Sequence, residues 1–472
     1  MTDVDLPQGW AMAQVGALGD FINGMAFKPT DWGETGTPII RIQNLTDPDR
    51  PINLTEREVD EKYVVEHGDI LVSWSATLDA FKWHGSRAYV NQHIFKVVPN
   101  SELDPGFVFY ALKKSIKELI SSEHLHGSTM KHINRRPFLA HPCALPPLNE
   151  QQRIVEKIET LFVELDKGEE SLRQVQTLLA RYRQSVLKAA VTGELTADWR
   201  AERTGKLEHG RDLLERILQT RRETWEGRGK YPEPDDPNIY GLPELPEGWV
   251  WASFDQLFDV FGGATPSRRE PKNWNGEIPW VSSGEVAFCR ISDTKEKITQ
   301  QGYESCSTKL HPAGTILLAM IGEGKTRGQA AILDVPACNN QNAAAIRASV
   351  TEIPPEYVYY YLKGRYEQSR KEGQGGNQPA LNGRKVKAFV MPLPSLEEMR
   401  EIVDRVGEAL DLSRSVEATC GVELKRSAAL RQSILKDAFS GRLVPQDPND
   451  EPVSELLARI HRSQEAGRAA KR

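Results

Sequence analysis

The sequence is poor in the features that mark secreted, membrane and metal-binding proteins. Its five cysteines are scattered, odd in number and without a CxxC pair, which argues against a disulfide framework or a zinc site and indicates a reducing compartment. Residues 1–10 contain no apolar stretch, so we expect no signal peptide. The longest apolar runs, such as 315–321, are too short to cross a bilayer. These absences predict a cytoplasmic protein without membrane contact.

Signatures of catalysis are missing as well. We find neither an Asn/Asp-Pro-Pro-aromatic tetrapeptide nor a glycine-rich loop after a first Rossmann-type strand, and no convincing carboxylate cluster of a metal-dependent nuclease. His124, His126, His132 and His141 are irregularly spaced and lack Cys or acidic partners, so we do not expect them to bind a metal. The sequence therefore predicts no catalytic residue, no bound cofactor and no metal site.

What is present is a globular composition with an acidic balance. Hydrophobic residues make up 39% of the chain and charged residues 27%, as in soluble folded proteins. The 472 residues exceed a typical domain of about 150 residues threefold, so more than one core is expected. A net charge of −6 does not indicate nucleic-acid binding, for which a basic patch is usual. It does not exclude such binding, because charge can be segregated by face or shared with partners.

The chain contains an internal repeat with a period of roughly 240–250 residues. The opening Leu-Pro-Gln-Gly-Trp at 6–10 recurs as Leu-Pro-Glu-Gly-Trp at 245–249. The proline-rich segment 145–155 recurs at 393–403, and 183–195 recurs at 431–443. Weaker matches, such as Asn91-Gln92 and Asn340-Gln341, lie in between. Similar ends around a divergent middle indicate two copies of one scaffold rather than a solenoid.

Each copy contains an α/β globule. In the first copy, β-rich runs at 38–42, 69–73 and 93–98 alternate with turn residues, and a helix is expected near 107–121. The second copy repeats this pattern, with β-rich runs at 278–281, 315–321 and 343–346 and a helix near 356–369.

A long helix follows the proline-rich exit of each globule. Ile154 to Val186 carry an apolar stripe in alternating steps of four and three, the pattern of a helix that packs lengthwise on another helix. The matching stripe from Ile402 to Ile434 is weaker, because polar residues at 413, 423 and 427 interrupt it. We expect the two helices to lie antiparallel.

These patterns predict an α/β (α+β) protein with a pseudo-twofold internal repeat: two globules of mixed sheet and short helices, separated by two long antiparallel, coiled-coil-like helices. We expect the parts of the chain to be globule 1 at 1–148, the first long helix at 149–195, a charged and proline-rich connector at 196–244, globule 2 at 245–395, the second long helix at 396–441 and a tail at 442–472.

Over essentially its whole length the chain resembles the specificity subunits of type I restriction-modification systems. The resemblance lies in the duplicated Leu-Pro-x-Gly-Trp opening, in the proline exit and helix start at 145–155, and in Gly-Glu-Leu-Thr-Ala-Asp-Trp-Arg at 193–200. It implies a non-catalytic subunit whose globules are target recognition domains, each reading one half of a split sequence in double-stranded DNA.

The same resemblance implies the partners. The long helices would set the distance between the half-sites and dock methyltransferase subunits, two of which could bind equivalent surfaces of the repeat. Restriction/translocase subunits would complete the complex, and S-adenosylmethionine and ATP would be bound by these partners rather than by this chain.

Reading a base edge requires side chains with paired donors and acceptors, such as Arg for guanine and Asn or Gln for adenine. Both globules carry such residues on expected loops. The DNA-binding candidates of globule 1 are Ser73, Trp74, Lys82, His84, Arg87, Asn91, Gln92, His93, Lys131 and Arg135. Those of globule 2 are Arg268, Arg269, Ser282, Ser283, Lys325, Arg327, Asn340, Gln341, Asn342, Asn377, Gln378 and Arg384.

Two alternatives remain at this point. Residues 319–326 (Ala-Met-Ile-Gly-Glu-Gly-Lys-Thr) fit the relaxed form of a phosphate-binding loop, which would make the chain a nucleotide-dependent enzyme. Such a loop must open a helix, whereas 327–333 reads as another strand, so we prefer a hairpin loop carrying Lys325 and Arg327 to DNA. The other alternative is a protein-only scaffold, which would show no salt-dependent association with DNA.

Overall fold

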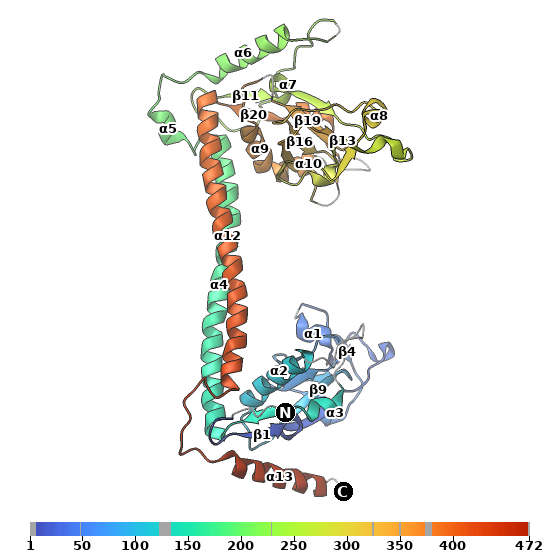
Figure 1. Ribbon diagram of the computed structural model, residues 1–472, viewed down its shortest axis with the longest axis vertical. Coiled ribbons are helices and arrows are strands. Elements are labelled where there is room, and N and C mark those ends of the chain that lie inside the picture. The colour runs from blue at the N-terminus through green and yellow to red at the C-terminus, as the bar shows by residue number, and fades with distance from the viewer. Residues whose placement is uncertain are drawn as a thin grey trace. The chain divides into compact units, whose positions relative to one another are not determined.

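The computed structural model describes residues 6–47, 49–121, 134–227, 229–322, 325–348, 351–372 and 380–470. The chain folds into two compact units (Figure 1). Unit 1 consists of residues 1–172 and 422–472, and unit 2 of residues 173–421. Two long helices, α4 (Leu148–Thr192) and α12 (Leu396–Ala438), each contribute one part to unit 1 and the other part to unit 2.

Unit 1 contains the first globule. Its strands include β1 (Ala11–Gln14), β2 (Gly19–Asn23), β3 (Thr37–Ile40), β4 (Asn53–Thr55), β5 (Val64–Val65), β6 (Ile70–Ser73), β7 (Asp79–Lys82), β8 (Ala88–Val90), β9 (Ile94–Pro99) and β10 (Pro142–Leu145). Its helices include α1 (Ile42–Thr46), α2 (Pro105–Ser121), α3 (Arg135–Leu139) and α13 (Val453–Ala470).

Two four-stranded sheets and one strand pair build this globule, in the orders β2-β9-β6-β7, β4-β3-β8-β5 and β1-β10. The predicted runs at 69–73 and 93–98 became β6 and β9, which pair antiparallel in the first sheet. The main core lies between this sheet and α2, whose Phe107 and Leu112 are fully buried. Helix α13 adds Leu456 and Ile460 to the same core.

Unit 2 contains the second globule. Its strands include β11 (Val250–Ser253), β12 (Asp259–Gly262), β13 (Trp274–Val281), β14 (Cys289–Ile291), β15 (Glu296–Ile298), β16 (Ile316–Ala319), β17 (Ala330–Leu333), β18 (Cys338–Asn339), β19 (Ala343–Arg347) and β20 (Val390–Leu393). Its helices include α5 (Ala197–Ala201), α6 (Gly210–Glu223), α7 (Phe254–Leu257), α8 (Gln300–Glu304), α9 (Pro355–Gly364), α10 (Tyr366–Glu372) and α11 (Gly383–Lys387).

The second globule repeats the strand orders of the first. Its main sheet, β12-β19-β16-β17-β14, matches β2-β9-β6-β7 and adds β14 at one edge. The three-stranded sheet β15-β13-β18 matches β4-β3-β8, and the pair β11-β20 matches β1-β10. The predicted repeat of two α/β globules is therefore confirmed at the level of sheet topology.

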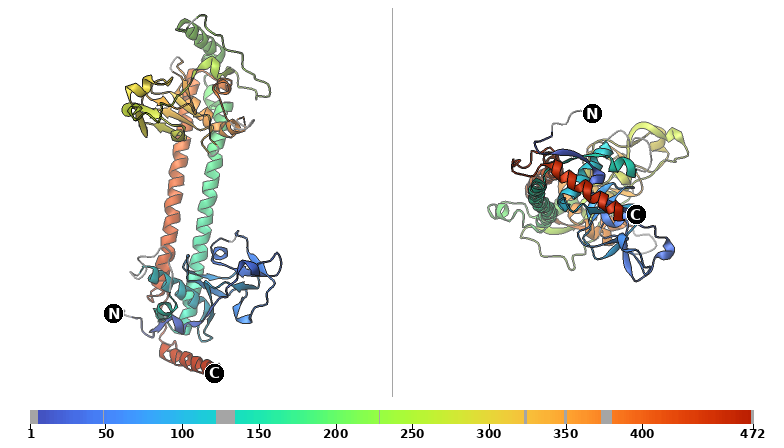
Figure 2. Two further views of the ribbon diagram at one scale, coloured as in Figure 1. Left: turned by 90° about the vertical axis from the view of Figure 1, so that its right-hand side faces the viewer. Right: turned by 90° about the horizontal axis from the view of Figure 1, so that it is seen from below.

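Within each unit, α4 and α12 lie side by side and antiparallel (Figures 1 and 2). In unit 1, the Arg431 guanidinium donates to Asp166 at 2.6 Å, and the Ser427 hydroxyl donates to Glu169 at 2.7 Å. In unit 2, the Arg183 guanidinium donates to the Ser413 hydroxyl at 2.7 Å. Residues with higher numbers on α4 thus contact residues with lower numbers on α12, which means that the two helices are antiparallel, as predicted. Two of the polar residues that interrupt the second stripe, at 413 and 427, are accordingly interhelical hydrogen-bond partners.

A buried junction ties the opening of each repeat to the helix that follows its globule. In unit 1, the Trp10 indole N–H donates to the Glu150 carboxylate in the first turn of α4, at 2.9 Å. In unit 2, the Trp249 indole N–H donates to Glu398 in the first turn of α12, also at 2.9 Å. The Leu-Pro-x-Gly-Trp repeat is therefore a structural motif, because its tryptophan donates a hydrogen bond to a buried carboxylate.

The repeat extends further than the sequence motifs indicated. Helices α6 and α13 occupy equivalent positions: the amide of Gly210 donates to the carbonyl of Gly248 at 2.7 Å, and that of Val453 donates to the carbonyl of Gly9 at 3.3 Å. The two acceptor residues, Gly248 and Gly9, each belong to a Leu-Pro-x-Gly-Trp opening. Residues 210–223 and the helix of the tail are therefore docked parts of the two units.

Candidate nucleic-acid interface

In the first globule, two loops emerge together from a pair of parallel strands. Strands β3 and β8 run parallel, with Ile40 opposite Val90. Directly beyond them, the amide of Asn91 donates to the carbonyl of Ile40 at 3.0 Å. Because parallel strands end at the same edge of a sheet, the segment 41–46 after β3 lies beside the turn 91–93 after β8.

The second globule repeats this arrangement. Strands β13 and β18 run parallel, with Val281 opposite Asn339. The amide of Asn340 donates to the carbonyl of Val281 at 3.0 Å, the same bond that Asn91 makes in the first globule. The segment 282–285 therefore lies beside the turn 340–342.

A hairpin loop from the main sheet completes each group. The loop 74–78 joins β6 to β7, and the amide of Trp74 donates to the carbonyl of His93 at 3.4 Å. The loop 320–329 joins β16 to β17, and the amide of Met320 donates to the carbonyl of Asn342 at 2.8 Å. We name segments 41–46, 74–78 and 91–93 loop cluster 1, and segments 282–285, 320–322, 325–329 and 340–342 loop cluster 2.

Loop cluster 1 gathers the central candidates of globule 1. Asn91, Gln92 and His93 form its turn, and the Trp74 ring packs on the His93 ring with centroids 5.2 Å apart. Ser73 is fully buried at the base of the hairpin, where its hydroxyl contacts the carbonyl of Thr77. Its position indicates a role in closing the hairpin.

Other candidates of globule 1 lie outside this cluster and have partners within the protein. Lys82 forms an ion pair with Glu159 at 3.2 Å, and the His84 ring lies against His67 with centroids 5.7 Å apart. Arg87 is bound by carboxylates at positions 61 and 66, whose hydrogen bonds raise the pKa of its guanidinium. Arg135 donates to the carbonyl of residue 21 at 2.8 Å. Lys131, His124, His126 and His132 lie outside the described residues.

In loop cluster 2, buried polar side chains organise the turn. The Asn340 side chain is buried, donates to the Ser283 hydroxyl at 3.5 Å and accepts from the amide of Asn342 at 3.1 Å. The Ser282 hydroxyl donates to the Glu285 carboxylate at 2.9 Å. Gln341 is exposed at the tip of the turn.

The described residues of 320–329 (320–322 and 325–329) lack the strand-to-helix setting of a phosphate-binding loop. Strand β17 follows this segment and pairs antiparallel with β16, so no helix N-terminus is available for a phosphate, as the sequence predicted. Lys325 is exposed on this loop. Arg327 is buried, and its guanidinium donates to the carbonyl of Arg370 at 3.2 Å, so in this conformation the side chain supports the hairpin.

The remaining candidates of globule 2 are spread over other segments. Arg268 lies 3.9 Å above the Trp274 ring and donates to Glu296 at 2.8 Å; this bond raises the pKa of the guanidinium and lowers that of the carboxyl. Arg269 and Arg384 are exposed, the latter in α11. Asn377 and Gln378 lie outside the described residues.

Three residues in and around loop cluster 1 are not among the candidates predicted from the sequence. Trp32, Arg41 and Gln43 line a cavity of about 440 Å³ together with residues 91–93. The signal was available, because Arg41 and Gln43 stand at the end of a predicted strand, where Ser282 and Ser283 were selected in the second copy.

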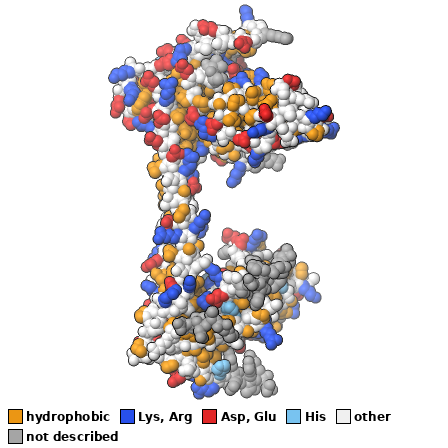
Figure 3. Space-filling view, viewed as in Figure 1, with side chains coloured by type: hydrophobic (Ala, Val, Ile, Leu, Met, Phe, Trp, Pro, Cys, Tyr) orange, Lys and Arg blue, Asp and Glu red, His pale blue; other side chains and the backbone are white. Residues whose placement is uncertain are grey.

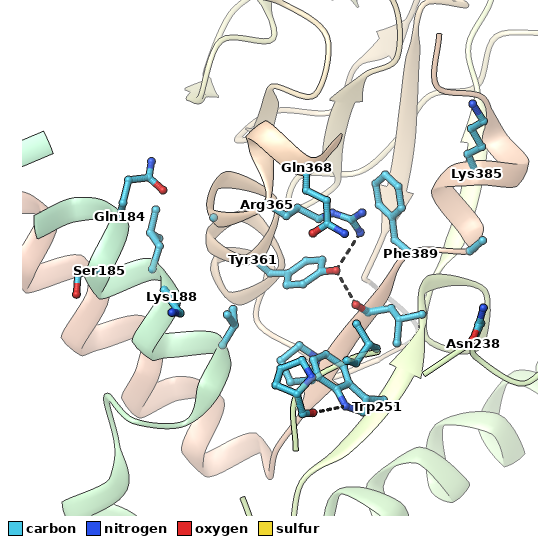
Figure 4. A pocket seen from close by; sticks show the side chains of 18 residues that line it. Gln184, Ser185, Lys188, Asn238, Trp251, Tyr361, Arg365, Gln368, Lys385 and Phe389 are labelled. Atoms are coloured by element: carbon cyan, nitrogen blue, oxygen red, sulfur yellow. Dashed lines mark hydrogen bonds between the residues drawn. The ribbon is translucent and has the colours of Figure 1, made fainter. Parts of the chain in front are cut away.

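A larger cavity, of about 1010 Å³, lies within unit 2 between α4, residues 238–243 and the second globule (Figure 4). Some of its polar groups are bonded to one another: Arg365 donates to the Tyr361 hydroxyl at 3.0 Å, and that hydroxyl donates to the carbonyl of Val390 at 2.6 Å. The Trp251 indole donates to the carbonyl of Pro243 at 3.3 Å. These bonds join α9, the connector and the pair β11-β20, so the cavity wall is a structural junction.

On the face drawn in Figure 3, the described residues form no concentrated basic patch. In the view of Figure 3, acidic and basic side chains are intermingled over both units. Within the described part of the chain, no group of three or more His, Cys, Asp or Glu side chains is arranged to hold a metal ion. No described helix combines the length and apolarity needed to span a bilayer.

Comparison with known proteins adds a family assignment. Residues 7–173 and 246–414 match the family described as "Type I restriction modification DNA specificity domain". The type I restriction enzyme EcoBI specificity subunit of Escherichia coli is 25% identical over 461 residues, which cover 94% of this chain and 88% of that one. The EcoAI specificity subunit of E. coli is 44% identical over 337 residues, covering 60% and 55%.

Two solved structures share the fold. The HsdS subunit from Thermoanaerobacter tengcongensis has a TM-score of 0.55 and 18% sequence identity, and the match covers 93% of this chain and 99% of that one. A chain from a study of complex assembly and conformational transition in the type I R-M system has a TM-score of 0.64 and 18% identity, with the same coverage. The two matched domain ranges coincide with the two copies of the repeat.

Proposed function

Because the chain belongs to the type I restriction-modification DNA specificity family, we propose that it is the DNA sequence-specificity subunit of a type I complex. Each globule reads one half of a bipartite target in double-stranded DNA, and the subunit is non-catalytic. One observation carries this proposal: both globules bring three loops together at the end of a parallel strand pair, with Asn-Gln at the same position of the turn. The glutamines of the two pairs, Gln92 and Gln341, are exposed, and a primary amide matches the donor and acceptor pattern of adenine.

The partners follow from the same role. Two methyltransferase subunits dock on the equivalent surfaces of the long helices, which set the spacing of the half-sites, and restriction/translocase subunits join them. S-adenosylmethionine and ATP are bound by those partners, and the complex works in the cytoplasm. The net charge of −6 favours such sharing, because the partners would supply part of the cationic surface that grips phosphate.

The proposal predicts salt-dependent DNA binding by the complex of this chain with its methyltransferase partner. The affinity for a duplex carrying the target should fall steeply between about 50 and 200 mM salt, because phosphate contacts release counterions. Fluorescence anisotropy with a labelled duplex would measure it, and the methyltransferase subunit alone is the control. If the complex forms but gives no salt-dependent association, the chain is a protein scaffold.

A further inference from the structure

The cavity of loop cluster 1 presents a single cationic side chain. Arg41 stands at its wall, with its guanidinium 5.4 Å from the centre of the Trp32 ring, a cation–π geometry. Gln43, Gln92 and Asn91 line the same cavity. The aromatic ring restricts the guanidinium, while the amide side chains beside it add paired donors and acceptors.

Among the described residues no carboxylate forms an ion pair with Arg41, and no acidic residue lines the cavity. Other candidate arginines differ in this respect. Arg87 is bound by Glu61 and Glu66, and Arg268 is bound by Glu296. Arg41 therefore keeps its guanidinium donors available for a ligand that brings acceptors.

We infer that Arg41 reads a guanine in the half-site that the first globule recognises. The planar fork of a guanidinium matches the O6 and N7 acceptors of guanine in the major groove. A phosphate contact is the competing role, but the side chain lines a cavity between loops and has amide neighbours suited to base edges. Trp32 acts as a positioning residue, because its ring supports the guanidinium. This inference rests on the proposed function.

The second globule has a different residue at the position equivalent to Arg41. Guanine reading by this position is therefore confined to one half-site. Ser282 follows β13 as Arg41 follows β3, and its hydroxyl is bonded to the carboxylate of Glu285. A serine beside a carboxylate cannot offer the donor fork of an arginine. The two halves of the target are therefore read by different chemistry, as expected for an asymmetric sequence.

The test uses the assembled complex with its methyltransferase partner and the split motif found by methylome mapping of the wild type. Competition binding would compare the motif duplex with duplexes that carry each single base-pair change. For Arg41→Ala, discrimination should fall about ten- to hundredfold at one G·C pair of one half-site and stay within about twofold elsewhere. Arg41→Lys should lose part of this discrimination while keeping the charge, because an ammonium group lacks the planar donor fork of a guanidinium. Arg50→Ala is the matched control, since Arg50 is an exposed arginine of the same globule, paired with Asp47.

Two results would overturn the inference. Unchanged discrimination at every position in Arg41→Ala would show that the cavity reads no base. Equal weakening on all duplexes, restored by Arg41→Lys, would show a phosphate contact. The proposed function fails in a different way, namely when the wild-type chain directs methylation to no split motif. Thermal unfolding of each variant complex verifies that the fold is kept.

Discussion

Replacing Glu398 by alanine is expected to lower the free energy of unfolding of unit 2 by about 3–5 kcal/mol. The carboxylate is 1% exposed and accepts hydrogen bonds from Trp249 at 2.9 Å, from the Thr196 hydroxyl at 2.7 Å and from Arg200 at 2.6 Å. Alanine would leave three buried or half-buried donors without this acceptor, one of them charged. Chemical denaturation, with hydrogen exchange to locate the transition in unit 2, would measure the loss.

Neighbouring and equivalent residues provide the controls for this prediction. Glu397 precedes Glu398 in the same helical turn but is exposed, so Glu397→Ala should change stability by no more than about 0.5 kcal/mol. Glu150 holds the equivalent place in unit 1, where Trp10 and Gln446 are its donors and burial raises its pKa. Both donors to Glu150 are neutral, so no cation would lose its partner. Glu150→Ala should therefore lower the free energy of unfolding less, by about 1–3 kcal/mol. A loss below 1 kcal/mol in Glu398→Ala would contradict the account of the junction.

The second large effect is expected at Gly441, where the end of the second repeat meets the opening of the first. Gly441 has a φ of +69°, and a Cβ atom there would lie 2.2 Å from the Cγ atom of Pro7. Gly441→Ala should therefore destabilise unit 1 by about 2–4 kcal/mol, from the left-handed backbone and from overpacking together. Urea denaturation would give the difference from the wild type.

A second glycine separates the two causes. Gly205 has a φ of +73°, and a Cβ atom there would have no neighbour within 4 Å. Gly205→Ala should consequently cost only the backbone part, about 1–2 kcal/mol. Gly193 repeats the crowded arrangement in unit 2, with Pro246 at 2.5 Å. Equal losses at Gly441 and Gly205 would mean that the contact between Gly441 and Pro7 does not contribute.

The ends of the repeat were predictable from sequence because their constraints are local or periodic. The paired globules and the long helices were predicted from three features: the Leu-Pro-x-Gly-Trp openings, the proline exits and the apolar stripe from Ile154. The fold confirms this prediction. The equivalence of α6 and α13 escaped notice because little more than Asp212-Leu-Leu and Glu455-Leu-Leu match in sequence, while the shared contact to Gly248 and Gly9 exists only in three dimensions.

The candidate site was predictable only in part, since it depends on pairings between distant strands. Asn91-Gln92 and Asn340-Gln341 were recognised as a repeated feature, but their approach to residues 41–46 and 282–285 follows from parallel strand pairs that no local pattern reveals. The burial of individual side chains could not be predicted from the sequence either. Arg327 was selected as a loop residue, whereas its guanidinium is buried and donates to the carbonyl of Arg370. Which of the selected side chains touch DNA stays a prediction.

The most direct test of the central claim is genome-wide mapping of N6-methyladenine by single-molecule sequencing, in cells with and without this gene. If the chain is the specificity subunit, methylation is expected at one split motif, with two defined halves at a fixed spacing. This methylation should disappear when the gene is deleted and return when it is restored. An unchanged methylome, in cells where the partner methyltransferase is present and active, would contradict the role of this chain as its specificity subunit.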